Sequence, residues 1–507
     1  MPFGVVNYVV LILYFLAMLA IGFWAGRRVK GEKGYFIAEG KIHYVLAGLS
    51  ILGTYLSALT MMALPALSFG SADWTWTVQL PCLLLTAFVI TRFVLPRYRE
   101  AGAMSVYAFL EQRIHVSSRF LASGCYLALA IGRNGLILYL AALAFRIVTG
   151  ADLATTIMVM GVVVTLYTAM GGMEGVIWTD AIQVVIFTLG AAVTIVFIFL
   201  RVWDAGGGFF AIANQYHKFR MFDGRLDLTQ VVTLWLVLQT IFETLRIYGT
   251  QQDMTQRYMT TESTAKANRS VWLAILGYIP LGYAFYFVGT GLFVFYHVQP
   301  GYDFFFMGGK VLGLFHLDPM VASLLNQNRA DAIYPYFIGT QMPAGAGGLV
   351  IAAFFAATMS TVSAVINSSS TVFIQDFYKR LTRTQRSDRH YLNVARGLTV
   401  LWGSLATVLA LLLARHAGLA QIAWAKIMAA TASGVLGLMA LAFLPFRVNK
   451  WAALIGFGAC YVCLFCLVRW TSVNFLLWPV IDNLVCFFVA LGVDRLLLRM
   501  GRPDSRP

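Results

Sequence analysis

The chain has 507 residues, of which 60% are hydrophobic and only 12% are charged, and its formal net charge is +15. A soluble protein of this length could not bury so much apolar surface, so most of that surface must face lipid. A basic excess on a soluble chain would suggest a nucleic-acid partner. Here the charges lie in short loops between apolar runs, and the positive-inside rule explains them without nucleic acid.

Apolar runs long enough to cross a bilayer as helices recur along the whole chain. The first run, residues 8–25, is a full span without a small-residue cleavage site, so we interpret it as a membrane helix and not as a signal peptide. We predict an all-α integral membrane protein with about 13 transmembrane helices. The predicted spans are 7–26, 44–69, 75–96, 119–148, 151–170, 177–201, 230–249, 271–297, 347–374, 396–414, 420–446, 451–469 and 475–497.

Basic residues in alternate loops predict the orientation. An odd number of spans places the termini on opposite sides, and the more basic loops belong to the cytoplasm. We therefore expect the N-terminus outside and the C-terminus inside. The residues that carry this prediction are Arg27, Arg28, Lys30, Lys33, Lys41, Arg97, Arg99, Arg113, Arg257, Lys266, Arg269, Lys379, Arg380, Arg383, Arg386, Arg389, Arg499, Arg502 and Arg506.

Three connecting segments differ from the short basic loops. The Gly- and aromatic-rich loop 202–229 should lie outside, and the long, weakly basic loop 298–346 is typical of a lid or gate. The polar segment QQDMTQRY, residues 251–258, follows the seventh span and should be a cytoplasmic hinge or gate. The six cysteines lie within apolar runs, so we expect neither a disulfide framework nor a metal site.

Two spans read as interrupted helices. The second has glycines, a polar cluster at 54–57 and Pro65, and the seventh has Thr240, Glu243, Thr244 and Arg246 before Gly249. They lie five spans apart. Broken helices at matching places in two halves predict an inverted repeat with its binding site near the bilayer midplane.

A broken helix leaves backbone carbonyls without intrahelical partners, and those oxygens suit a small hard cation. Gly53 and Leu56 lie where the second span would unwind. On the ninth span, Ser360 and Thr361 offer hydroxyl oxygens, and Ala357 offers a carbonyl one turn earlier. The alternative is that these small hydroxyl residues only let helices pack closely.

Asp180 begins the sixth span within GGMEGVIWTDAIQ, residues 171–183. A carboxylate inside the hydrocarbon is costly, so it usually faces a cavity, a partner or an ion. Ser363 lies one turn beyond Ser360, so both hydroxyls can face the same partner helix. The alternative is an interfacial Asp180 beside the aromatic anchor Trp178.

Arg133 lies too deep in its span to reach the interface easily. Its guanidinium is suited to a bidentate anion such as the carboxylate of a solute. The alternative is a structural ion pair with Glu243 or Asp180. Glu243 and Arg246 are three residues apart and could pair on one helix face, or Arg246 could line the solute path.

Two of these motifs, GGMEGVIWTDAIQ and QQDMTQRY, resemble hallmarks of the sodium:solute symporters, over about residues 5–445. Within that family the likeness is greatest to bacterial sialic acid symporters. The matching stretches are LSILGTYLSALTMMALPA, IGRNGLILYL and GLVIAAFFAATMSTVSAVINS. The resemblance implies a leucine-transporter-type core within a single domain, 1–507. An extra helix (7–26) would precede two inverted five-helix repeats (44–201 and 230–446), and two helices (451–497) would follow.

The resemblance also implies the roles of site residues. The main sodium ion would be held by Gly53, Leu56, Ala357, Ser360 and Thr361, and a second by Asp180, Ser360 and Ser363. The solute would contact Ser57, Thr60, Gln79 and Arg133, with Arg246 lining its path. Ala364 replaces a serine of the sialic acid branch, which predicts a weak second sodium site. Ala58, Thr75 and Arg246 also depart from the pattern of that branch.

We therefore predict a sodium-coupled symporter that imports a small carboxylate-bearing solute, such as sialic acid or a related sugar acid. It would be a monomer in the inner (plasma) membrane. The alternative is a sodium symporter for a monocarboxylate, a neutral sugar or an amino acid. An intramembrane enzyme would need a nucleophile–base pair or metal ligands at depth, and the spans offer none. A transporter-like sensor would need a signalling domain, and only RMGRPDSRP follows Leu498.

Overall fold

The structure is a computed structural model. It describes residues 3–70, 73–102, 104–202, 208–298, 303–307, 310–315, 332–382, 386–415 and 433–500. The elements are α1 (Val5–Gly26), α2 (Gly31–Ile37), α3 (Tyr44–Tyr55), α4 (Ala58–Phe69), α5 (Gln79–Val89), α6 (Leu95–Ala101), α7 (Ala108–Arg113), α8 (Val116–Thr149), α9 (Leu153–Val202), α10 (Phe209–Gln215), α11 (Thr233–Thr250), α12 (Gln252–Tyr258), α13 (Thr264–Val298), β1 (Asp303–Met307), β2 (Lys310–Phe315), α15 (Ile333–Gln341), α16 (Ala346–Val372), α17 (Lys379–Thr382), α18 (Asp388–Arg415), α20 (Val435–Ala442), α21 (Lys450–Trp470) and α22 (Trp478–Arg499).

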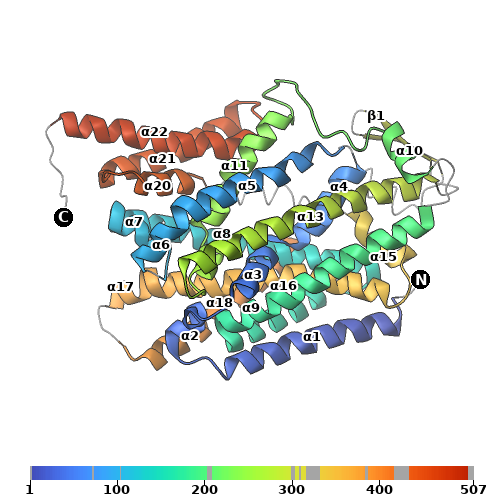
Figure 1. The fold of residues 1–507 in the computed structure, drawn as a ribbon, viewed down its shortest axis with the longest axis horizontal. Helices are drawn as coiled ribbons and strands as arrows, with labels where there is room; N and C mark the ends of the chain where they lie inside the picture. Colours follow the sequence, from blue (N-terminus) through green and yellow to red (C-terminus); the bar gives the residue numbers. More distant parts are fainter. Residues whose placement is uncertain are drawn as a thin grey trace.

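Most of the long helices run side by side along one direction of the molecule (Figure 1). Among the described residues, 9 helices are long and apolar enough to cross a membrane, and the bent pair α3 and α4 makes a tenth. Leu13 on α1 and Leu200 on α9 are among the many large apolar side chains exposed on the outside, which is the arrangement expected of lipid-facing helices. The chain is thus a multi-pass membrane protein.

The predicted spans 151–170 and 177–201 both fall within one element, α9, but the chain turns back between them. Gly172 has φ 54° and ψ −151°, which is not helical. A Cβ atom at Gly175 would lie 3.9 Å from the Tyr167 carbonyl, a proximity that a straight helix cannot give residues eight apart. α9 therefore comprises two antiparallel helices joined at Gly172, as the two predicted spans require.

The second span is broken, as predicted. α3 ends at Tyr55, α4 begins at Ala58, and the two helices are bent by 59°. Leu56 and Ser57 between them have extended dihedral angles. Gly53 lies within α3, one turn before the break.

The interruption that we predicted inside the seventh span is wrong. α11 continues from Thr233 to Thr250. The hydroxyls of Thr240 and Thr244 donate to the carbonyls four residues earlier, so both are satisfied within the helix. The break falls at Gln251, whose φ and ψ of −86° and 131° are extended. α12 follows it at once.

Segment 251–258, which we predicted to be a cytoplasmic hinge or gate, is buried. Every residue of α12 is buried, and Asp253 and Arg257 are 0% exposed. α12 packs against α3 and α16 in the interior of the bundle. Arg257 therefore contributes no charge to a cytoplasmic loop and gives no support to the predicted orientation.

The connecting loops contain more structure than the sequence indicated. The loop after α9 includes α10, and its Lys218 donates to the Phe69 carbonyl at the end of α4 at 3.0 Å. In the loop 298–346, β1 pairs antiparallel with β2, so the chain is not entirely α-helical, and α15 follows. Residues 299–302, 308–309 and 316–331 of that loop, and residues 420–432 of the eleventh predicted span, lie outside the described residues.

Candidate functional site

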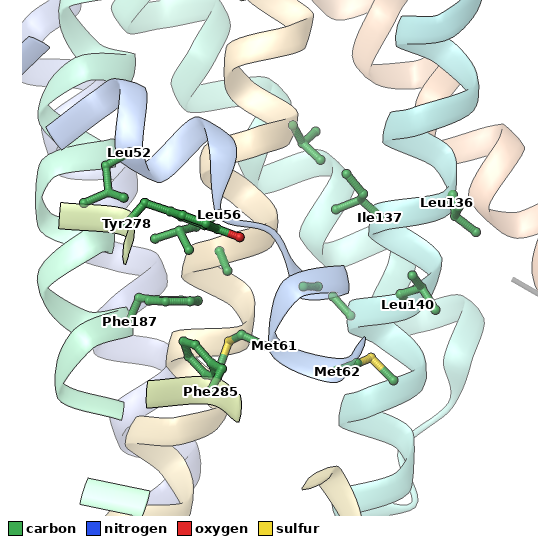
Figure 2. Close-up of a cluster of buried hydrophobic side chains, with 14 of the residues drawn as sticks. Leu52, Leu56, Met61, Met62, Leu136, Ile137, Leu140, Phe187, Tyr278 and Phe285 are labelled. Carbon is green, nitrogen blue, oxygen red and sulfur yellow. The ribbon is translucent and has the colours of Figure 1, made fainter. Parts of the chain in front are cut away.

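The site lies around the break between α3 and α4, where α8, α9 and α16 converge on it. Figure 2 shows the extended link beside Leu56, with Met61 and Met62 on α4 and Ile137 and Leu140 on α8. The surrounding side chains are largely apolar and buried. Polar groups at the break therefore act in a low dielectric, where each electrostatic contact is strong.

One predicted sodium-coordinating residue, Thr361, lies within hydrogen-bonding distance of two others, Leu56 and Ala357. The Thr361 hydroxyl on α16 lies 2.9 Å from the Leu56 carbonyl and 3.2 Å from the Ala357 carbonyl. It is also 3.3 Å from the Thr54 carbonyl. Four oxygens from the break and from α16 therefore converge.

Ser360 adds a further oxygen close to the break. Its hydroxyl is buried and has no hydrogen-bond partner among the residues that the structure describes. A Cβ atom at Gly53 would lie 2.8 Å from this hydroxyl, so a larger residue at position 53 would crowd it. A buried, unpartnered oxygen is costly unless something binds it, which fits a site for a cation.

Asp180 is fully buried, so its interpretation as an interfacial residue is wrong. Its Oδ2 accepts from the Ser50 hydroxyl at 2.5 Å and from the Arg257 guanidinium at 2.9 Å. Its Oδ1 has no hydrogen-bond partner in the described part of the chain. Ser363 is also buried, but its hydroxyl donates to the Ser360 carbonyl at 3.0 Å.

Arg133 has a structural partner, but neither of the two that we predicted. Its Nη1 lies 3.1 Å from Asp253 Oδ2 and 3.1 Å from the Gln251 side-chain oxygen. Its Nη2 reaches to 3.5 Å from the Thr54 carbonyl, immediately before the break. Glu243 instead binds Arg246 through two hydrogen bonds of 2.9 and 2.6 Å, as the predicted pair on one helix face requires.

The other predicted solute positions are distributed over three helices. Ser57 and Thr60 form a capping box at the start of α4, with the Ser57 amide 3.4 Å from the Thr60 hydroxyl. Gln79 begins α5, and Arg246 lies on α11, which packs against α5. The structure joins neither Gln79 nor Arg246 to Arg133 by a hydrogen bond within the described residues.

Sequence reasoning missed four residues of this network: Ser50, Thr54, Asp253 and Arg257. The available signal was the pair of opposite charges four residues apart in QQDMTQRY, in a segment between two long apolar runs. We interpreted that polar segment as a cytoplasmic hinge or gate. Two charges of opposite sign in a buried helix each need a partner, and here the partners come from α8 and α9.

Comparisons with known proteins identify the family of the chain. The model of the sodium:solute symporter family matches residues 35–458. The sodium/sialic acid symporter SiaT of Proteus mirabilis is 30% identical over 488 residues, covering 95% of this chain and 93% of the relative. Human sodium-coupled monocarboxylate transporter 2 is 28% identical over 471 residues, covering 90% of this chain and 70% of the relative.

A solved structure gives the same result in three dimensions. A Na⁺-coupled sialic acid symporter, in a substrate-bound outward-open state, has a TM-score of 0.85 at 29% identity, with 98% of each chain covered. Mhp1, a nucleobase-cation-symport-1 transporter, has a TM-score of 0.56 at 13% identity and 93% and 96% coverage, a likeness of fold alone. The chain belongs to the sodium:solute symporter family. It is a sodium-coupled transporter and not an enzyme.

Proposed function

We propose that this protein imports sialic acid or a related sugar acid together with sodium, by alternating access around the break between α3 and α4. The observation that carries this proposal is the convergence of the Leu56 and Ala357 carbonyls with the Thr361 hydroxyl. Beside them lies the Ser360 hydroxyl, which has no hydrogen-bond partner within the described part of the chain. Gly53, Leu56, Ala357, Ser360 and Thr361 hold the main sodium ion. This set supplies the uncharged oxygens that a dehydrated hard cation needs.

The solute carboxylate binds at Arg133, near the start of α4. The Arg133 side chain is 12% exposed and directs one nitrogen at the Thr54 carbonyl, so its guanidinium lies next to the break. α4 begins there, and a helix N-terminus favours an anion. Ser57, Thr60, Gln79 and Arg246 bind the remainder of the solute. One relative is named as a symporter of sialic acid and another as a transporter of monocarboxylates. Both solutes carry a carboxylate, which supports an anion at this position.

A second sodium ion binds weakly at Asp180, Ser360 and Ser363. Asp180 already has a cationic partner in Arg257, and Ala364 offers no hydroxyl at the position next to Ser363. Both observations support a low affinity.

The chain spans the inner membrane about 13 times as a monomer, with two inverted repeats, an outside N-terminus and an inside C-terminus. In Figure 1, α1 begins at the right end of the molecule and α22 ends at the left end. The short elements α2, α7 and α17, which adjoin the basic loops, gather at the left, while α10 lies at the right. Because basic loops face the cytoplasm, the gathering of basic segments at one end supports a cytoplasmic location for that end, which is on the left in Figure 1.

Uptake into proteoliposomes tests the function. Radiolabelled N-acetylneuraminate should accumulate with external sodium and not with choline, and Ser360→Ala combined with Thr361→Ala should abolish accumulation. Each lost oxygen contact to a charge is worth about 1.5–3 kcal/mol. Thr358→Ala is the matched control, because that buried α16 hydroxyl donates to Phe354 within its own helix. Undiminished uptake in choline would exclude sodium coupling. Preference for lactate or a neutral sugar would reassign the solute.

A further inference from the structure

α12 carries the counter-charges of both binding sites. Its Asp253 pairs with Arg133, which the proposed function assigns to the solute. Its Arg257 pairs with Asp180, which the proposed function assigns to the second sodium ion. Asp253, Arg257 and Asp180 are each 0% exposed, so none of these charges can turn to water when its partner is taken away.

Asp253 and Arg257 are also four residues apart on the same helix. That spacing places their side chains on one face, where an acid and a base can pair. The Arg257 guanidinium already donates through Nη1 to the main-chain carbonyl of Asp253. The two charged groups are therefore neighbours that do not pair in this structure, because each is held by a group on another helix.

We propose that sodium and solute bind cooperatively by exchanging the partners of these four charges. The proposal rests on the proposed function, and it assigns Asp253 and Arg257 as positioning residues. The solute carboxylate takes Arg133 and frees Asp253. Sodium takes Asp180 and frees Arg257. When both have bound, the freed Asp253 and Arg257 pair with each other.

The cooperativity follows from counting the buried charges that lack a partner. With neither ligand bound, both ion pairs are intact. With the solute alone, Asp253 lacks a cation, and with sodium alone, Arg257 lacks an anion. An unpaired buried charge is strongly disfavoured, so each ligand alone binds weakly. With both ligands bound every charge is paired again, and each ligand therefore raises the affinity for the other by the same factor.

Binding measurements on the purified full-length protein test this exchange. Calorimetric titration gives the Kd of N-acetylneuraminate in sodium chloride and in choline chloride, and the ratio of the two is the coupling factor. For wild type we expect a factor in the usual allosteric range, about 5–150. Asp253→Asn should tighten solute binding in choline, because Arg133 no longer has to be released, and should reduce the factor several-fold. Asp253→Asn combined with Arg257→Gln should reduce it no further, because Asp253→Asn alone already leaves a freed Arg257 without an acid to pair with, and the factor that remains belongs to the main sodium ion.

Glu111→Gln is the matched control, since it also removes a partly buried carboxylate that binds an arginine, Arg119 at 2.7 Å. It should leave the coupling factor unchanged. If the coupling factor of Asp253→Asn equalled that of wild type, the proposed exchange of partners would be wrong. If wild type bound no N-acetylneuraminate in either salt, the proposed solute would be wrong, and the next measurement would decide on the exchange.

Sodium binding without solute provides that independent measurement. Thermal unfolding is followed as sodium chloride replaces choline chloride at constant ionic strength. Arg257→Gln should lower the sodium concentration for half-maximal stabilisation several-fold, because Asp180 is no longer occupied by a guanidinium. An equal or higher sodium requirement in Arg257→Gln would show that Arg257 does not compete with the ion, and the exchange would be wrong.

Discussion

At the scale of single residues, the site combines uncharged oxygens for one cation with buried charges that already have partners. Thr361 and Leu56 belong to the first group, and Arg133 and Asp180 to the second. The uncharged oxygens can accept an ion without releasing anything strongly bound. The charged groups cannot, because an ion or a carboxylate must first displace an existing partner.

Replacing Arg133 should separate its geometry from its charge. Arg133→Lys keeps the charge but loses the planar fork that binds a carboxylate through two parallel hydrogen bonds. We expect the Kd for N-acetylneuraminate to rise by roughly tenfold or more, which corresponds to losing one hydrogen bond to a charged group, about 1.5–3 kcal/mol. Arg113→Lys, which alters an arginine bound to the carbonyls of Ala442 and Leu444, is the control. If Arg133→Lys bound the solute as tightly as wild type, Arg133 would be purely structural.

A hydroxyl at position 364 should strengthen the second sodium site. Ala364 is fully buried on α16 beside Ser363, and its own side chain offers no oxygen. Ala364→Ser should raise the Hill coefficient of sodium-dependent uptake towards two, because the ion gains a ligand. The control is Ala352→Ser, an equally buried alanine about three turns away on the same helix. A wild-type coefficient already near two, and unchanged by Ala364→Ser, would contradict a weak second site.

At the scale of secondary-structure elements, three departures from regular helix shape the core. These are the break at Leu56–Ser57, the break at Gln251 and the reversal at Gly172. The first two frame the site, because α12 packs against α3. The third brings the two halves of α9 together, and Asp180 lies on the second half, close to the reversal.

The reversal should depend on the glycine. Gly172 has positive φ, and a Cβ atom there would lie 2.8 Å from the Tyr35 carbonyl oxygen. Gly172→Ala should therefore destabilise the protein by about 1–3 kcal/mol through backbone strain alone, and lower the Tm in detergent. Gly124→Ala, on α8 with no atom within 4 Å of the new methyl group, should leave the Tm unchanged or raise it. An equal Tm for Gly172→Ala and Gly124→Ala would mean that the turn at Gly172 tolerates a side chain.

At the scale of the whole molecule, the number of sodium ions decides whether the membrane potential drives uptake. One sodium with a monoanionic solute moves no net charge, whereas two move one positive charge inward. That charge gains about 2.3 kcal/mol per 100 mV. If the second sodium site is weak, the membrane potential should affect the rate of uptake only at sodium concentrations high enough to fill that site.

A potassium diffusion potential set with valinomycin tests this expectation. An inside-negative potential should stimulate uptake by wild type at high sodium and have little effect at low sodium. Uptake by Ala364→Ser should respond to the potential at a lower sodium concentration, because its second sodium site fills at a lower concentration. Strong stimulation of wild type at limiting sodium would show instead that two ions are always coupled, and no stimulation at any concentration would show that only one is.

The sequence alone predicted the class of protein and most of the spans. It also pointed to many of the candidate site residues. Hydropathy is a local property, so apolar runs mark membrane helices without knowledge of their neighbours. A carboxylate at 180 and an arginine at 133 drew attention because charged residues are costly in an apolar span. The hydroxyls at 360 and 361 drew attention because their oxygens suit a hard cation. The family resemblance then implied roles for them, and the family itself is confirmed.

Which groups meet could be learned only from the packing of the helices. Arg133 pairs with Asp253 and Asp180 with Arg257, across sequence separations of 120 and 77 residues. Local patterns carry no information on such pairs, so our candidate partners for Arg133 were wrong. The same limit applies to α11, whose polar segment is helical while the break falls at Gln251. In a membrane protein, polarity in a sequence marks either water or a buried partner, and only the packing of helices distinguishes the two.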